Sequence, residues 1–101
     1  GTAKGLTQLL DSTGKEWHDK LGLPGEYDPF NPEQNRAIGE AYLGWLTGQF
    51  DGDTKLALAA YNFGIGNLRK LLNRTGATSF DEIKNKLPDE TRNYVNKITK
   101  A

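Results

Sequence analysis

Leu56-Ala-Leu-Ala-Ala-Tyr-Asn-Phe-Gly-Ile-Gly-Asn67 is the stretch of this sequence that decides its fold. The apolar run at residues 56–60 consists of strong helix formers and predicts a buried helix. We expect this helix to stop at Tyr61 and Asn62, because the two glycines that follow allow a positive φ or a close backbone approach. Two interpretations are open: a core helix with a glycine C-cap, or a helix that delivers a Tyr and an Asn into a glycine-lined site wall.

The composition describes an ordinary globular chain. Its 101 residues are 36% hydrophobic and 26% charged, with thirteen basic and thirteen acidic side chains. This is enough for one modest core, and we expect residues 1–101 to form a single domain. Because the charges cancel, no overall field attracts nucleic acid or an anionic membrane, and neither is an expected partner. No apolar run approaches the roughly 20 residues of a membrane-spanning helix.

The residue types that hold metals are scarce in this chain. It has no cysteine and a single histidine, His18. Disulfides and thiolate chemistry are therefore excluded, and a zinc site is not expected. We interpret His18 as a surface or helix-end residue, because no ligand residues cluster with it. The run Asp51-Gly52-Asp53 lacks the other ligands of a calcium loop and indicates a turn whose Asp53 caps the next helix. We expect no metal and no cofactor.

Helical signals occur along the whole chain. Apolar residues recur every three or four positions, and capping residues precede most of these runs. We predict that the helices begin near Gly5, after Ser12 or Thr13, at Pro32, after Asp53, at Asn67, after Ser79 and at Pro88. The buried faces are expected to include Leu21, Trp45 and Ile98. No segment alternates as a strand does, so the sequence predicts an all-α fold of six or seven short helices.

Four motifs stand in a fixed order along the chain. They are Ala-Lys-Gly-Leu-Thr-Gln at 3–8, Asp28-Pro29 with Asn35-x-x-x-Gly39-x-x-Tyr42-Leu43, the stretch at 56–66, and Leu-Pro-Asp-Glu-Thr-Arg-Asn-Tyr-Val at 87–95. Together they resemble the soluble lytic transglycosylase family, the lysozyme-like SLT domain. The family patterns are approximately GAxGLMQ, DPxxNIxxGxxYLxxL, LALAAYNAGPG and LPxETxxYV. The resemblance covers nearly the whole chain and implies a lysozyme-like helical bundle.

The resemblance implies an activity on peptidoglycan, whose glycan strand is then the expected partner. Family members cleave the β-1,4 bond between N-acetylmuramic acid and N-acetylglucosamine with one Glu, which acts as general acid and then as base. The muramic acid 6-hydroxyl attacks and leaves a 1,6-anhydro end, unlike the usual two-carboxylate glycosidases. A cell-envelope location is implied. The run Phe50-Asp51-Gly52-Asp53 is also similar to phage virion transglycosylase domains, which adds a phage particle as a second location.

The sequence departs from the family at the general acid. The catalytic Glu of the family lies in an ESxF-like segment before the GAxGLMQ motif, and this chain begins at Gly1, inside or just before that motif. We expect the acid and its helix upstream of Gly1, and this chain alone to be inactive. The following residues match no catalytic position of the family: Glu16, Glu26, Glu33, Glu40 and Glu82. Loss of a helix would expose apolar surface, which predicts low stability, self-association or a partner segment in its place.

The resemblance implies roles for the residues that match its motifs. Gln8 would line the saccharide cleft; the alternative is an exposed helix residue. Tyr61 would direct its hydroxyl at the missing acid, positioning it and tuning its protonation; the alternative is a core Tyr. Glu90 would lie across the cleft as a second polar contact; the alternative is a first-turn Glu favoured by the helix dipole.

Glycines complete the implied substrate-binding residues. Asn62, with Gly64 and Gly66, would shape the floor against the sugar; the alternative is a plain helix C-cap. Thr7, Phe63 and Ile65 replace the residues usual in the family patterns. The subsite details of the family therefore do not carry over.

Three other functions remain open. The first is a non-catalytic glycan-binding or structural module of a phage particle or secretion assembly, which would bind chitin oligomers without forming a product. The second is hydrolysis, as in goose-type lysozymes of the same architecture, which the product ends would distinguish. The third is a helical interaction domain in which the four motifs are coincidental.

Overall fold

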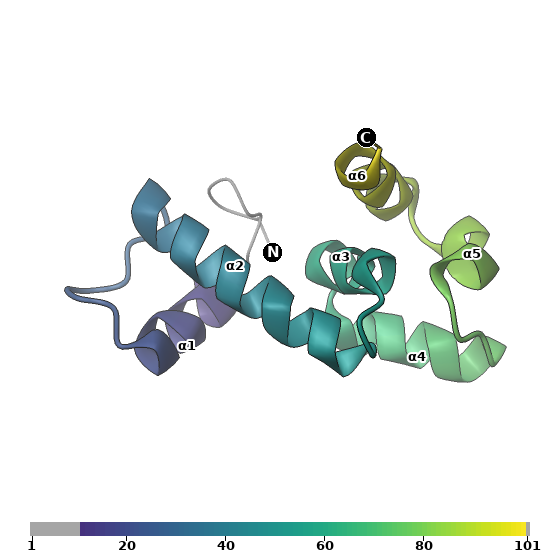
Figure 1. The fold of residues 1–101 in the computed structure, drawn as a ribbon, viewed down its shortest axis with the longest axis horizontal. Helices are drawn as coiled ribbons and strands as arrows, with labels where there is room; N and C mark the ends of the chain where they lie inside the picture. Colours follow the sequence, from purple (N-terminus) through teal and green to yellow (C-terminus); the bar gives the residue numbers. More distant parts are fainter. Residues whose placement is uncertain (1–10, 101) are drawn as a thin grey trace. The chain divides into compact units, whose positions relative to one another are not determined.

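The computed structural model describes residues 11–100, in which every regular element is helical (Figure 1). The α-helices are α1 (Asp11–Leu21), α2 (Pro32–Gln49), α3 (Thr54–Phe63), α4 (Ile65–Thr75), α5 (Phe80–Ile83) and α6 (Asp89–Thr99), and a 3-10 helix, η1 (Lys84–Lys86), follows α5. This confirms the all-α prediction. The helix predicted near Gly5 lies outside the described residues. No described helix is long and apolar enough to cross a bilayer.

The chain divides into two compact units, the first ending at Gly44 and the second beginning at Trp45. The division falls inside α2, so this helix contributes residues to both units. The single-domain expectation stays a prediction.

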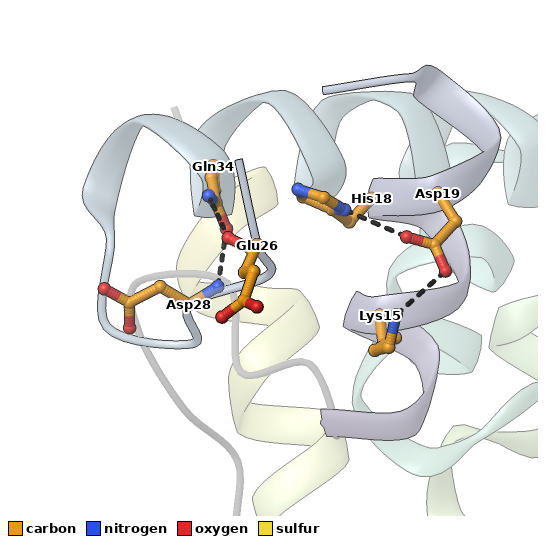
Figure 2. A network of polar contacts seen from close by, with 6 residues as sticks. All are labelled: Lys15, His18, Asp19, Glu26, Asp28 and Gln34. Carbon is orange, nitrogen blue, oxygen red and sulfur yellow. Dashed lines mark hydrogen bonds and ion pairs between the residues drawn. The ribbon is translucent and has the colours of Figure 1, made fainter. Parts of the chain in front are cut away.

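In the first unit, the helix cap at Asn31 and the side chain of Gln34 hold the loop between α1 and α2 in place. Asn31 Oδ1 accepts hydrogen bonds from the backbone N–H groups of Glu33 (2.9 Å) and Gln34 (3.0 Å), which confirms the predicted cap before Pro32. The side chain of Gln34 takes no part in this cap. It accepts from the Asp28 N–H at 2.8 Å and donates to the Glu26 carbonyl at 3.0 Å, and so fastens the loop to α2 (Figure 2).

Two sequence expectations for α1 are wrong, and a third is right only in part. Ser12 and Thr13 lie inside the helix, so neither caps it. Leu21 is 41% exposed at the last residue of α1 instead of packing in the core. His18 lies in the last turn of α1, as expected for a helix-end residue, but it is 4% exposed and so does not lie at the surface. Helical periodicity identifies a face but not its partner, and here the loop after α1 covers His18 with Tyr27, whose ring lies edge-on at 6.0 Å.

In the second unit, α3 is the central helix. Asp53 Oδ1 accepts from the Leu56 N–H at 3.0 Å, as predicted for the N-cap. Every residue from Leu56 to Tyr61 is buried. α3 packs against both α4 and α6 (Figure 1). An apolar helix is stable here because two neighbouring helices cover it.

One residue, Gly64, joins α3 to α4. Its φ of 98° and ψ of 132° end α3, and its N–H donates to the Ala60 carbonyl at 2.8 Å. Its carbonyl accepts from the Leu68 N–H at 2.9 Å inside α4. α3 therefore continues to Phe63, and α4 begins before Asn67, two residues earlier than predicted.

The end of α4 and the start of α5 are set by capping residues beside them in the chain. Gly76 has a left-handed conformation and caps α4 through its N–H to the Leu72 carbonyl. Ser79 Oγ accepts from the Glu82 N–H at 3.3 Å, which confirms the predicted start of α5. That helix is a single turn, and η1 carries the chain on to the buried Leu87.

Two large apolar side chains expected in the core are exposed: Trp45 by 42% and Ile98 by 51%. Successive residues of a helix point about 100° apart, and the residue after Trp45 in α2, Leu46, is fully buried, as is Ile38. The buried face of α6 consists of Thr91 and Val95, one turn apart, and Ile98 lies beyond it near the helix end.

Candidate functional site

The last turn of α3 carries two of the predicted site residues. Tyr61 is 8% exposed, and its ring stacks on that of Tyr94 in α6, with centroids 6.4 Å apart and an interplanar angle of 11°. Parallel rings of this kind pack large apolar areas together and fix the direction of each ring. Burial also raises the pKa of Tyr94 above its ordinary value, so this phenol stays neutral at physiological pH.

The neighbouring Asn62 is held by a residue that sequence reasoning missed. The Thr91 hydroxyl of α6 donates a hydrogen bond of 2.8 Å to Asn62 Oδ1. Thr91 is 1% exposed, so this bond lies where water cannot replace it. The one available signal was its place in the Leu-Pro-Asp-Glu-Thr motif, directly after Glu90.

Glu90 directly precedes Thr91 in the chain. It lies in the first turn of α6 and is exposed, and the next residue is the one tied to Asn62. The structure therefore associates the first turn of α6 with the last turn of α3. The last turn of α3 carries Tyr61, whose hydroxyl is buried, and Asn62, and the first turn of α6 carries Glu90.

The two predicted glycines differ in what the backbone requires. Gly64 has a positive φ, and a Cβ there would lie 3.4 Å from Asn67 Nδ2. Gly66 is helical and exposed, and a Cβ there would meet nothing within 4 Å. Of these two positions, only Gly64 has a backbone conformation that requires glycine.

Two predictions concern the beginning of the chain, which the structure does not describe. Gln8, the remaining predicted site residue, lies outside the described residues, and so does Gly1. The expectation that the catalytic Glu lies upstream of Gly1 is therefore not tested by the structure and stays a prediction. What the structure does show is the environment of every glutamate that the chain contains.

No glutamate lies in an apolar environment. All six glutamates of the chain fall between residues 11 and 100, and each is exposed: Glu16, Glu26, Glu33, Glu40, Glu82 and Glu90. Glu82 instead accepts hydrogen bonds from the hydroxyls of Thr78 and Ser79, both at 3.1 Å. A general acid that is protonated near neutral pH needs burial to raise its pKa. None of these side chains has that burial.

The metal-ligating side chains of the described residues form no cluster at these positions. Within the described part of the chain, no group of three or more His, Cys, Asp or Glu residues could hold a metal ion. A pocket of about 350 Å³ lies in the first unit instead, beside His18. None of the predicted site residues lines it.

Residues 1–84 match the family described as the transglycosylase SLT domain. The chain belongs to this family. The match confirms the resemblance drawn from the four motifs, and it ends before Glu90 and Thr91. The phage type of the family has no support among the relatives described next.

Sequence matches to known proteins extend over almost all of this chain. A soluble lytic murein transglycosylase of Escherichia coli K12 is 34% identical over 95% of the chain and 16% of its own length. A Haemophilus influenzae protein whose name refers to the same activity is 40% identical over 95% of the chain and 17% of its own length. The SLT chain thus spans about one sixth of the length of these relatives. No solved structure gave a significant match.

Proposed function

We propose that this SLT chain is part of a lytic transglycosylase that cleaves the β-1,4 bond between N-acetylmuramic acid and N-acetylglucosamine in peptidoglycan and leaves a 1,6-anhydro end. The observation that carries the proposal is the bond between Thr91 and Asn62, which holds the first turn of α6 against the last turn of α3 in a chain of the SLT family. The names of the relatives, which refer to murein transglycosylases, support the same substrate.

In this proposal the residues act in the following ways. Tyr61 positions the general acid and tunes its protonation, which its buried ring, held by Tyr94, supports. Asn62, with Gly64 and Gly66, forms the floor against the sugar. Glu90 contacts the glycan from the first turn of α6, and its exposure leaves it accessible to a ligand. Gln8 lines the cleft.

We further propose that the general acid lies upstream of Gly1 and is not among these 101 residues. The support is chemical: every glutamate is exposed, whereas a general acid working near neutral pH requires an apolar site. These residues by themselves should bind glycan without turning it over. The bacterial relatives favour the cell envelope over a virion as the place of action.

The test uses the 101-residue chain, purified murein and chitotetraose. We expect chitotetraose to perturb the backbone amide signals of Asn62 and Glu90, and murein digests to contain no released muropeptides by mass analysis. Glu90→Gln should weaken binding by roughly 5- to 30-fold, the loss expected for one charged hydrogen bond. Glu33→Gln, an exposed glutamate of α2, should leave binding unchanged.

Each other outcome rejects a stated part of the proposal. Release of 1,6-anhydro products by the 101-residue chain would show that the acid is present. Products with reducing muramic acid ends would indicate hydrolysis. Absence of chitotetraose binding would remove the glycan function. Binding by a longer form of the protein that also releases nothing would favour the alternative, a non-catalytic glycan-binding module.

Self-association, or a partner segment in place of a further helix, is part of the same proposal. Four large apolar side chains are exposed in the described residues: Leu21, Phe30, Trp45 and Ile98. Sedimentation at increasing concentration should show a rise in mass, or the chain should unfold at low temperature. A monomer with a cooperative melt at high temperature would reject this expectation.

A further inference from the structure

A pocket of about 350 Å³ lies between α1 and the loop that follows it (Figure 2). Its walls are three residues of α1 and three of the loop: Lys15, His18, Asp19, Gly25, Glu26 and Tyr27. All of them belong to the first unit, and none takes part in the proposed transglycosylase site. The pocket is therefore a separate feature of the chain.

The imidazole of His18 is the unusual group in this pocket. Its Nδ1 lies 3.1 Å from Asp19 Oδ1. The same hydrogen bond, with help from Lys15, holds the pKa of Asp19 below its ordinary value. An ionised carboxylate only accepts, so Nδ1 carries the hydrogen and donates it. In the neutral imidazole the lone pair then lies on Nε2, on the opposite side of the ring.

Nε2 is buried and has no hydrogen-bond partner among the described residues. His18 as a whole is 4% exposed, so bulk solvent does not reach this nitrogen. A buried acceptor without a donor loses its hydration and gains nothing in return, which destabilises the folded chain. Such a group in a native protein calls for an explanation, and here a pocket adjoins the same ring.

Tyr27 closes the pocket against α1. Its ring meets that of His18 edge-on, with the centroids 6.0 Å apart. Its hydroxyl lies over Gly14, where a Cβ would come within 2.2 Å of the Tyr27 oxygen. Because Gly14, one turn before His18, has no side chain, the Tyr27 phenol packs directly on the surface of α1. The pocket gains an aromatic wall from this close approach.

Some of the polar groups that line the pocket have a hydrogen-bond partner, and others have none among the described residues. Lys15 Nζ lies 3.0 Å from Asp19 Oδ2, so Lys15 and His18, the two α1 donors that line the pocket, bind the same carboxylate. The Glu26 carboxylate has no partner in the described part of the chain, and Gln34 holds only its backbone carbonyl. The two unused groups, Nε2 and this carboxylate, are both acceptors. With a neutral imidazole, the excess of acidic over basic side chains makes the lining of the pocket negative.

We propose that this pocket binds a primary alkyl ammonium group. The ammonium supplies what the walls lack: it donates to Glu26 and to His18 Nε2 and balances the excess negative charge. Its alkyl chain lies against the Tyr27 ring. A neutral hydroxyl is also a donor, but it leaves the charge of Glu26 uncompensated. Nε2 is closed to water in the free chain, so the side chain of Tyr27 or Glu26 shifts when the ligand binds.

The test is a nuclear magnetic resonance titration of the 101-residue chain with n-butylammonium. His18 is the single histidine, so its ring nitrogen signals need no assignment by mutation. At about pH 8 an ordinary imidazole is neutral and an alkylamine is protonated. We expect a saturable shift of the Nε2 signal. Glu26→Gln should raise the dissociation constant about tenfold, whereas Glu40→Gln, an exposed glutamate of α2, should not change it.

Two further ligands separate charge from hydrogen bonding. n-Butanol has a donor without a charge, and tetramethylammonium has a charge without an N–H group. Each should bind at least about tenfold more weakly than n-butylammonium. The proposal is overturned by an Nε2 signal that does not saturate, by equal binding of either control ligand, or by unchanged affinity in Glu26→Gln.

Discussion

The Thr91 hydroxyl of α6 donates a 2.8 Å hydrogen bond to Asn62 Oδ1 of α3, from a side chain that is 1% exposed. These residues are 29 positions apart in the chain, and their bond is a side-chain link between the two helices that carry the candidate site. Thr91→Val keeps the shape of the side chain and removes its donor. We expect it to lower the free energy of unfolding by about 1–3 kcal/mol, measured by urea denaturation.

Two further measurements separate the contribution of the Thr91–Asn62 hydrogen bond to stability from that of side-chain packing. Thr91→Ser keeps the donor and loses a methyl group, so its cost should be about 1 kcal/mol. In a double-mutant cycle with Asn62→Ala, Thr91→Val should couple by about 0.5 kcal/mol or more. Additive effects of the two substitutions would show that the hydrogen bond contributes nothing to stability.

The two site glycines should respond oppositely to alanine. Gly64 has a φ of 98°, which an alanine adopts only with strain, so Gly64→Ala should cost about 1–3 kcal/mol. Gly66 is helical with open space around its Cα, so Gly66→Ala should stabilise α4 by about 0.5–1 kcal/mol. Thermal unfolding of both variants measures this difference. Equal effects at the two positions would contradict the assigned backbone conformations.

Tyr94 should make the stability of the second unit fall at alkaline pH. Burial raises the pKa of Tyr94 above its ordinary value of 10.0, so the folded chain holds this proton more tightly than the unfolded chain does. The contribution is complete below the unfolded pKa and is lost as the pH rises through the higher folded pKa. Tyrosinate absorbance and urea unfolding up to about pH 11 measure it. In Tyr94→Phe the loss with rising pH should be smaller, and an unchanged slope would exclude this residue as its source.

Gly14 should not tolerate a side chain, because the Tyr27 hydroxyl occupies the space that a Cβ would need. A Cβ at Gly14 would lie 2.2 Å from the Tyr27 oxygen and 2.6 Å from the carbon that bears it. Gly14→Ala should therefore cost about 1–3 kcal/mol and shift the ring signals of His18, because Tyr27 must move. Gly48→Ala in α2, where a Cβ meets nothing within 4 Å, is the matched control and should not destabilise the chain. A stable Gly14→Ala variant with unchanged His18 signals would contradict the described packing.

Local chemistry explains the features that were predicted from the sequence. Asn31, Asp53 and Ser79 each cap a helix by accepting from an N–H two or three residues further along the chain. Gly64 and Gly76 adopt a positive φ where glycine alone is unstrained. These interactions involve neighbours in the chain, so the residue order is sufficient to predict them. The family, likewise, follows from four motifs whose order is a property of the sequence.

The tertiary structure decided which face of each helix meets a partner. Helical spacing gives an apolar stripe, but it does not say how wide the covered part of that stripe is. Trp45 and Ile98 fall outside the buried faces, whereas His18 is covered by Tyr27. The bond between Thr91 and Asn62 also depends on how α6 packs on α3. Sequence alone determined the helical class, the caps at Asn31, Asp53 and Ser79, and the family. Packing between distant segments decided the buried histidine, the exposed tryptophan and the threonine that bonds to Asn62, because those contacts form only in the folded chain.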